Sequence, residues 1–197
     1  MTMSFLDEYL SYNKKFVENK EYEPYVIKEV PHNKPAIVAC MDSRMVHLLP
    51  KALNIKVGEA KMIKNAGAEV KGFYDSTIRS LLVAIYLMEV DEVFIIGHDR
   101  CGMDGFDGNI LVDVIKKRGV DVSNLDKSPE ELGEWFSGSS SAEEGIRESV
   151  EFVKNHPLVP KDVLVHGFMI SLATGELDPV TLDPRRFETV SLETPKV

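Results

Sequence analysis

Apolar residues recur along the chain with two different spacings. Within residues 4–20, Phe5, Leu6, Tyr9 and Leu10 recur at helical spacing among charged residues, which predicts an amphipathic helix. A polar connector with two prolines follows, and we expect residues 1–33 to form an N-terminal helix and connector. A helix set apart in this way packs on a neighbouring subunit about as often as on its own domain.

From Pro35 onward, short continuous apolar runs alternate with segments of helical periodicity. Such alternation is typical of an α/β protein whose mainly parallel sheet is covered by helices on both faces. We therefore expect residues 34–197 to form one α/β domain, and the polar stretch 119–145 to be a surface excursion with a helical turn. The pattern predicts strands at 35–40, 60–67, 91–98 and 162–170, and helices at 46–54, 73–88, 109–119 and 143–156.

Composition narrows the class of protein and of partner. The chain has 197 residues, enough for one well-filled core, and a formal net charge of −9, which argues against nucleic acid as a partner. Its longest apolar run, LLVAIYLM, is too short to span a membrane. Two cysteines without a recognisable export signal predict free thiols in a cytoplasmic protein. A small anionic substrate remains compatible with this charge.

Both cysteines and one histidine follow strand-like runs. Cys40 ends the first predicted strand, His98 ends the third, and Cys101 comes three residues later. The carboxyl ends of parallel strands face one crevice, so we expect these side chains to converge. Two thiolates and one imidazole form a tetrahedral zinc set with one ligand missing, as in catalytic zinc sites. Asp42 is near enough in sequence to be a fourth ligand or to stand beside the metal.

Other interpretations of the same residues have less support from the sequence. A single cysteine at a strand end is more often part of the core than a ligand. A Cys–His nucleophile pair would leave the second cysteine without a role. A phosphatase loop needs five residues between its Cys and Arg, whereas three separate Cys40 from Arg44. In the zinc interpretation, the Arg44 fork holds the Asp42 carboxylate bidentately; the plainer alternative is a surface ion pair.

The paired motifs Cys40-Met-Asp42-Ser-Arg44 and His98-Asp-Arg-Cys101 resemble those of the β-class carbonic anhydrases. The stretches NAGA at 65–68 and CGM at 101–103 are also similar to that family. So is the segment 155–177, which resembles its last helix, strand and hairpin. The resemblance extends over about residues 34–180.

The resemblance implies a zinc enzyme that reversibly hydrates CO2 to bicarbonate and a proton. Cys40, His98 and Cys101 would bind one Zn2+ per chain, and residues 34–197 would be the catalytic domain. Asp42 would accept a hydrogen bond from a zinc-bound hydroxide, and Arg44 would hold Asp42. In some members this aspartate swings onto the zinc. The family also implies a homodimer in which the N-terminal helix embraces the partner.

Several points stay open at the level of sequence. Arg100 and Asp99 depart from the family pattern; the Arg100 charge either stabilises the hydroxide or pairs outward with Asp99. His32 and His47 are conceivable proton carriers, although a plain surface role is favoured for both. Alternatives to CO2 hydration are hydrolysis of carbon disulfide or carbonyl sulfide on the same scaffold, a catalytically silent zinc protein, and a redox dithiol.

Overall fold

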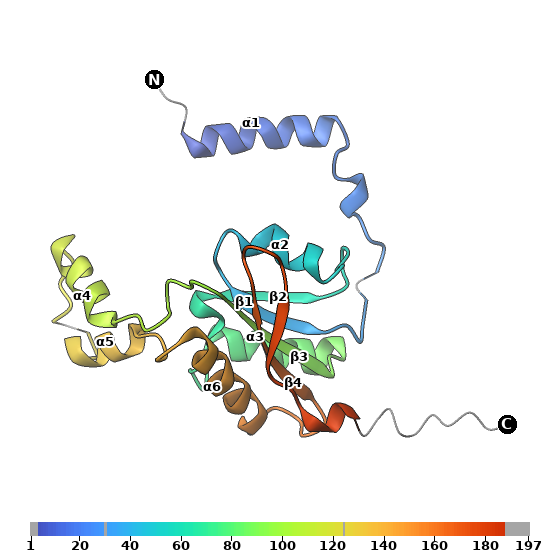
Figure 1. Cartoon of the computed structure of the whole chain (residues 1–197). Helices are drawn as coiled ribbons and strands as arrows, with labels where there is room; N and C mark the ends of the chain where they lie inside the picture. The colour runs from blue at the N-terminus through green and yellow to red at the C-terminus, as the bar shows by residue number, and fades with distance from the viewer. Residues whose placement is uncertain (1–3, 30, 124, 188–197) are drawn as a thin grey trace. The chain divides into compact units, whose positions relative to one another are not determined.

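The computed structural model describes residues 4–29, 31–123 and 125–187. The chain divides into two compact units, of which the first ends at residue 31 and the second begins at residue 32. The first unit holds helix α1, Phe5–Glu18, and the short 3-10 helix η1, Glu23–Tyr25 (Figure 1). Ser4 caps α1, because its hydroxyl accepts a hydrogen bond from the Asp7 amide at 3.2 Å. No residue of α1 is buried.

The second unit is built on a five-stranded sheet of order β2-β1-β3-β4-β5. The first four strands pair in parallel, and β5 runs antiparallel to β4. The predicted α/β domain with a mainly parallel sheet is therefore confirmed. The strands are β1 Ala36–Cys40, β2 Lys61–Asn65, β3 Glu92–His98, β4 Leu164–Ile170 and β5 Leu177–Thr181.

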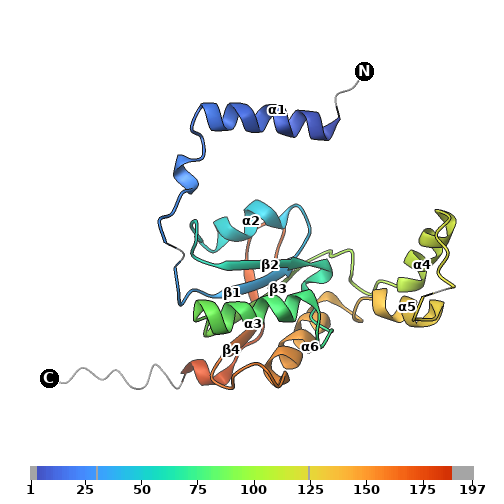
Figure 2. The ribbon, with the colours of Figure 1, turned by 180° about the vertical axis from the view of Figure 1, so that it is seen from behind.

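Helices cover both faces of this sheet. Helices α3 and α6 lie on one face and α2 lies on the other, as two opposite views show (Figures 1 and 2). The helices of this unit are α2 Met45–Ala52, α3 Ser76–Met88, α4 Gly108–Lys117, α5 Pro129–Phe136 and α6 Ala142–Asn155, with 3-10 turns η2 Ala66–Ala68 and η3 Pro184–Phe187.

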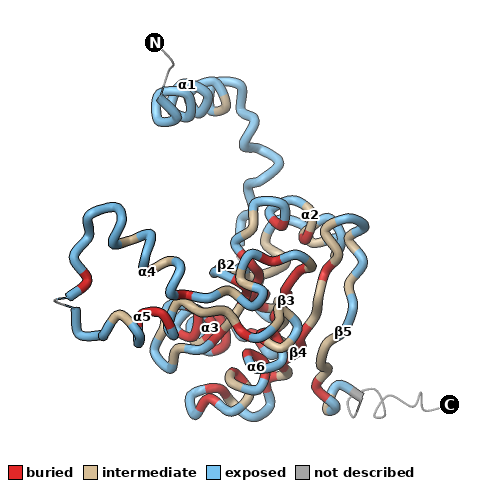
Figure 3. Tube along the Cα trace, turned by 60° about the vertical axis from the view of Figure 1, so that its left-hand side comes forward, coloured by how far each residue is buried: buried red, intermediate tan, exposed pale blue. Residues whose placement is uncertain are grey.

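Two apolar cores flank the sheet, and buried residues follow the central strands and the inner faces of the helices (Figure 3). On one face, Ile78 and Leu81 of α3 and Ile146 of α6 pack on alternate strand residues. On the other, Met45 and Leu49 of α2 do so. Because both faces of β1 are covered, all five of its residues are buried, which explains its continuous apolar run.

The stretch 119–145 contains more structure than the expected surface excursion with a helical turn. Helix α5 spans Pro129–Phe136 and begins with a capping box between Ser128 and Glu131. It packs on α4 around a small core of its own, in which Val112, Val122 and Leu132 are buried. The sequence did not predict this core because few apolar residues form it within a largely polar stretch. None of the described helices is long and apolar enough to cross a membrane.

Candidate metal centre

Cys40, His98 and Cys101 converge at the carboxyl end of the sheet. Adjacent parallel strands β1 and β3 end at Cys40 and His98, and the turn after β3 brings Cys101 back toward them. One potential ligand atom from each residue lies within 4.8 Å of the other two, and all three residues are buried. The two sulfur atoms are 3.9 Å apart. Two sulfurs at 2.3 Å from one tetrahedral zinc would be separated by about 3.8 Å.

The imidazole of His98 is oriented by its own backbone neighbour. Its Nδ1 lies 2.8 Å from the carbonyl oxygen of Asp99. Because a carbonyl oxygen only accepts, Nδ1 carries the ring proton and donates a hydrogen bond to that oxygen. Its Nε2 then presents a lone pair toward the two thiols. Nε2 is buried and has no hydrogen-bond partner among the described residues. A buried nitrogen without a partner is costly, and a metal ligated by it would remove that cost.

The environment of the two thiols favours one thiolate. Burial opposes ionisation of the Cys40 thiol, but the neighbouring His98 imidazole and the amides of Asp42 and Gly67 together lower its pKa to about 7. For Cys101, burial is the main effect and raises the pKa to about 11, and the nearby Cys40 charge adds to it. A divalent cation between the sulfurs would favour ionisation of both.

Asp42 is held beside this group by Arg44. Arg44 donates from Nε to Oδ1 at 2.9 Å and from Nη2 to Oδ2 at 2.6 Å. The Arg44 amide also donates to Oδ1 at 2.9 Å. These contacts hold the pKa of the Asp42 carboxyl well below its usual range. Its Oδ2 is 3.9 Å from His98 Nε2, so the carboxylate stands next to the cluster but rests on Arg44.

The donor set fits a transition-metal ion with an open coordination position. Among the described residues, Cys40, His98 and Cys101 are the one group of three potential ligands that meet this closely. Structural zinc sites close with four protein ligands, whereas catalytic sites use three and leave room for water. Asp42, held by Arg44, leaves that position free.

The structure decides between the two orientations considered for Arg100. Its side chain is 69% exposed, and its Nε donates to Asp99 Oδ2 at 3.2 Å. Asp99 in turn accepts a hydrogen bond from the amide of Leu172 at 2.7 Å. Arg100 is thus paired with Asp99 at the surface. His47 is exposed on α2, and the exposed His32 lies 3.6 Å from Glu89.

Two contacts of the cluster were not foreseen from the sequence. The amide of Gly67, a residue with φ of 77°, is one of the groups that lower the pKa of the Cys40 thiol. Lys64 donates from Nζ to the carbonyl oxygen of Cys40 at 2.9 Å. The NAGA motif marks the position of Gly67, but nothing in a single sequence assigns a role to Lys64.

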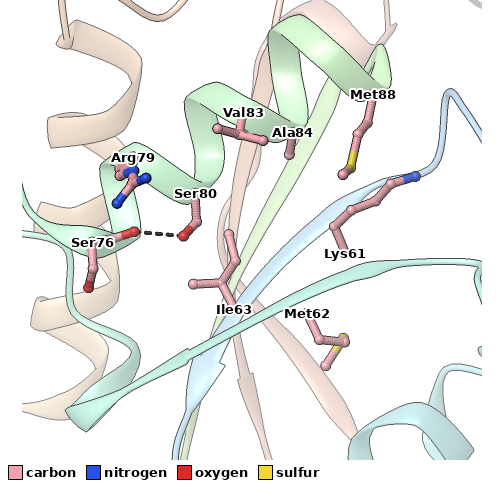
Figure 4. Close-up of a pocket in the computed structure, with 9 residues that line it drawn as sticks. All are labelled: Lys61, Met62, Ile63, Ser76, Arg79, Ser80, Val83, Ala84 and Met88. Atoms are coloured by element: carbon pink, nitrogen blue, oxygen red, sulfur yellow. Dashed lines mark hydrogen bonds between the residues drawn. The ribbon is translucent and has the colours of Figure 1, made fainter.

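A separate groove of about 450 Å³ lies between the edge strand β2 and helix α3 (Figure 4). Lys61 and Ile63 line it from β2, and Arg79 and Ser80 line it from α3. No residue of the metal cluster borders this groove. It is therefore distinct from the predicted site.

Fold and cluster together define a parallel α/β protein that carries a buried Cys2His group of the kind that binds a catalytic metal. A family model described as carbonic anhydrase matches residues 35–177. The chain belongs to this family, and its relatives place it in the β class, which confirms the resemblance read from the paired motifs.

Individual relatives cover most of the chain. The "Putative carbonic anhydrase YvdA" of Bacillus subtilis (strain 168) is 45% identical over 90% of this chain and 92% of its own. A carbon disulfide hydrolase of Acidithiobacillus thiooxidans is 32% identical over 76% of this chain and 79% of its own. The crystal structure of β-carbonic anhydrase isoform I from Trichomonas vaginalis superposes with a TM-score of 0.82 at 33% identity, over 91% of this chain and 99% of that one.

Proposed function

We propose that this protein catalyses the zinc-dependent, reversible hydration of CO2 to bicarbonate and a proton. The observation that carries this proposal is the buried Cys40–His98–Cys101 group, with its unpartnered His98 Nε2, in a chain of the carbonic anhydrase family. Zn2+ bound there lowers the pKa of a water ligand and so supplies a hydroxide nucleophile near neutral pH. The reaction makes the protein a lyase.

Each residue of the cluster has a distinct part in holding the metal. Cys40 and Cys101 supply thiolates, and His98 supplies Nε2, for one Zn2+ per chain. The carbonyl of Asp99 fixes the tautomer and the ring plane of His98. The amides of Asp42 and Gly67 favour the thiolate form of Cys40. The ring of His98 is thus oriented before the metal binds.

Asp42 and Arg44 act beside the metal. Arg44 fixes the orientation of the Asp42 carboxylate, which would accept a hydrogen bond from the attacking oxygen and orient its lone pair toward CO2. A silent zinc protein would instead have Asp42 as the fourth ligand. The rest position of Asp42 on Arg44 favours the active interpretation.

Hydrolysis of carbon disulfide is a second candidate function, because a relative at 32% identity carries the name carbon disulfide hydrolase. Both reactions add water to a small linear molecule, so access to the pocket, rather than the metal ligands, distinguishes them. Zinc-loaded protein is assayed for CO2 hydration and for hydrogen sulfide release from carbon disulfide and carbonyl sulfide. We expect CO2 turnover to exceed the other two by orders of magnitude. Faster sulfide release would assign the second function.

We further propose a homodimer as the minimal assembly, with residues 34–197 as the catalytic domain and residues 1–33 as an arm that covers the partner. Large apolar side chains of α1, Phe5, Leu6 and Leu10, are 62–75% exposed, and such a surface is usually covered by a partner. Light scattering on the full chain tests this. A dimer that dissociates in Leu6→Asp/Leu10→Asp protein is expected; a wild-type monomer would contradict it.

A cytoplasmic location suits this chemistry. The two thiols, 3.9 Å apart, must both stay reduced to bind a metal, and an oxidising compartment would oppose that.

A further inference from the structure

The charges around the metal centre are almost balanced before any substrate binds. Two thiolates offset the two positive charges of a zinc ion, and Arg44 offsets Asp42 through a bidentate contact. Arg100 forms an ion pair with Asp99, and Lys71 forms one with Glu69. Each of these pairs is therefore neutral overall and offers no net positive charge to an additional anion at the metal.

Lys64 supplies a cation that none of these pairs neutralises. It lies on the edge strand β2, where Ala39 of β1 is its register partner. Side chains alternate along a strand, so Lys64 is on the opposite face of the sheet from Lys61 and Ile63, which Figure 4 shows turned toward α3. From there its Nζ reaches the carbonyl oxygen of Cys40 at 2.9 Å.

This contact anchors the ammonium on the backbone of a proposed metal ligand, although Lys64 as a residue is exposed to solvent. Partial burial lowers the pKa of Lys64, while the charges of Cys40 and Asp42 act on it in the opposite direction. Lys64 thus lies within electrostatic reach of both anions. Its hydrogen-bond acceptor is a neutral carbonyl, so its charge is not cancelled by the group that anchors it.

We propose that Lys64 is a positioning residue whose ammonium, anchored on the Cys40 carbonyl, supplies the positive charge that favours an anion at the metal centre. This role rests on the proposed function, because hydroxide and bicarbonate are the anions of that reaction. It also assigns to Lys64 the effect that the sequence suggested for Arg100.

The test compares three substitutions that separate charge from hydrogen bonding. Lys64→Arg keeps both, Lys64→Gln keeps a donor without charge, and Lys64→Met removes both. Lys56→Met is the matched control, because it removes one exposed Lys charge away from the cluster. Each protein is loaded with cobalt(II), and azide binding is followed by the visible absorption of the metal at a pH well below the midpoint of its pH-dependent spectrum.

A charge within about 6 Å can shift such an equilibrium by up to about tenfold, which is the upper limit for the exposed Lys64, because solvent screening reduces the effect. We expect azide to bind about 3- to 10-fold more weakly to the Gln and Met variants. The spectral midpoint should rise by about half a unit to one unit in both. The Arg variant and the Lys56→Met control should match the wild type, with one cobalt per chain throughout.

Other outcomes would overturn the proposal in distinct ways. A Gln variant identical to the wild type, beside a weakened Met variant, would show that the hydrogen bond matters and the charge does not. Loss of cobalt from the Gln variant would make Lys64 a structural support of Cys40. Unchanged binding in all variants would leave it a surface residue. Because azide binding needs no CO2 turnover, the Lys64 result stands apart from failure of the proposed function.

Discussion

Replacement of Arg44 by Ala isolates the part that Asp42 plays in the reaction. The substitution removes both side-chain hydrogen bonds, at 2.9 and 2.6 Å, and leaves Asp42 with the backbone amide of residue 44 at 2.9 Å. Arg44 is not a member of the ligand group, so we expect one zinc per chain in the variant.

The Arg44→Ala substitution does not change the charge of Asp42 at neutral pH. Arg44 depresses the pKa of the Asp42 carboxyl, so the pair stabilises the fold above the ordinary pKa of 3.8 and loses that effect as pH falls through the depressed value. Without Arg44 the pKa returns toward 3.8, and the carboxyl still stays ionised at pH 7. Only its orientation is lost. Loss of such a positioned group costs about 10²-fold in turnover.

Stopped-flow hydration of CO2 by metal-analysed protein measures the effect. Turnover of Arg44→Ala should fall about 10²-fold, by the same factor at every pH above neutrality. Arg100→Ala is the matched control, because it removes the other Arg–Asp pair near the cluster, whose contact is a single bond at 3.2 Å. Wild-type turnover in zinc-replete Arg44→Ala protein would refute the role of Asp42.

Further predictions concern the ligands and their support. Cys40→Ser and Cys101→Ser should each lose most of the zinc and the activity together; full zinc occupancy in both would contradict the assignment. Chelation should expose two reactive thiols per chain: Cys40 reacts increasingly as pH rises through its pKa of about 7, and Cys101, with a pKa of about 11, reacts slowly. Equal reactivity before and after chelation would argue against bound metal. Gly97→Ala would bring a methyl group to 2.8 Å from Met169 Sδ and 2.9 Å from Ile146 Cγ1. It should cost about 1–3 kcal/mol in denaturant unfolding and weaken zinc binding through His98; an unchanged midpoint would contradict this packing.

The fold could be predicted from the sequence to a large extent because its strands are buried on both faces. Continuous apolar runs marked β1 and β3, and the parallel pairing of these strands brought Cys40 and His98 to the same edge. Strand β5 gave no such signal from its residues. It is an edge strand that contains Pro179, and only the family resemblance suggested a hairpin there.

The contacts around the cluster were less accessible to sequence reasoning. The Asp42–Arg44 pair follows from local spacing, since two residues apart beyond a strand they can meet directly. The contact of Lys64 with Cys40 depends on the register between β2 and β1, which the sequence of one chain does not encode in a readable way. The orientation of Arg100 depends on a positive φ of 54°, which the sequence did not predict.

Titration of zinc into metal-free protein, with the initial rate of CO2 hydration measured at each step, tests the central claim most directly. The rate should rise in proportion to added zinc and stop rising at one zinc per chain, and the fully loaded protein should become faster with pH up to a plateau above neutrality. Cys40→Ser protein should stay inactive throughout. A rate that is independent of zinc, or zinc bound at one per chain without CO2 hydration at any pH, would contradict the account.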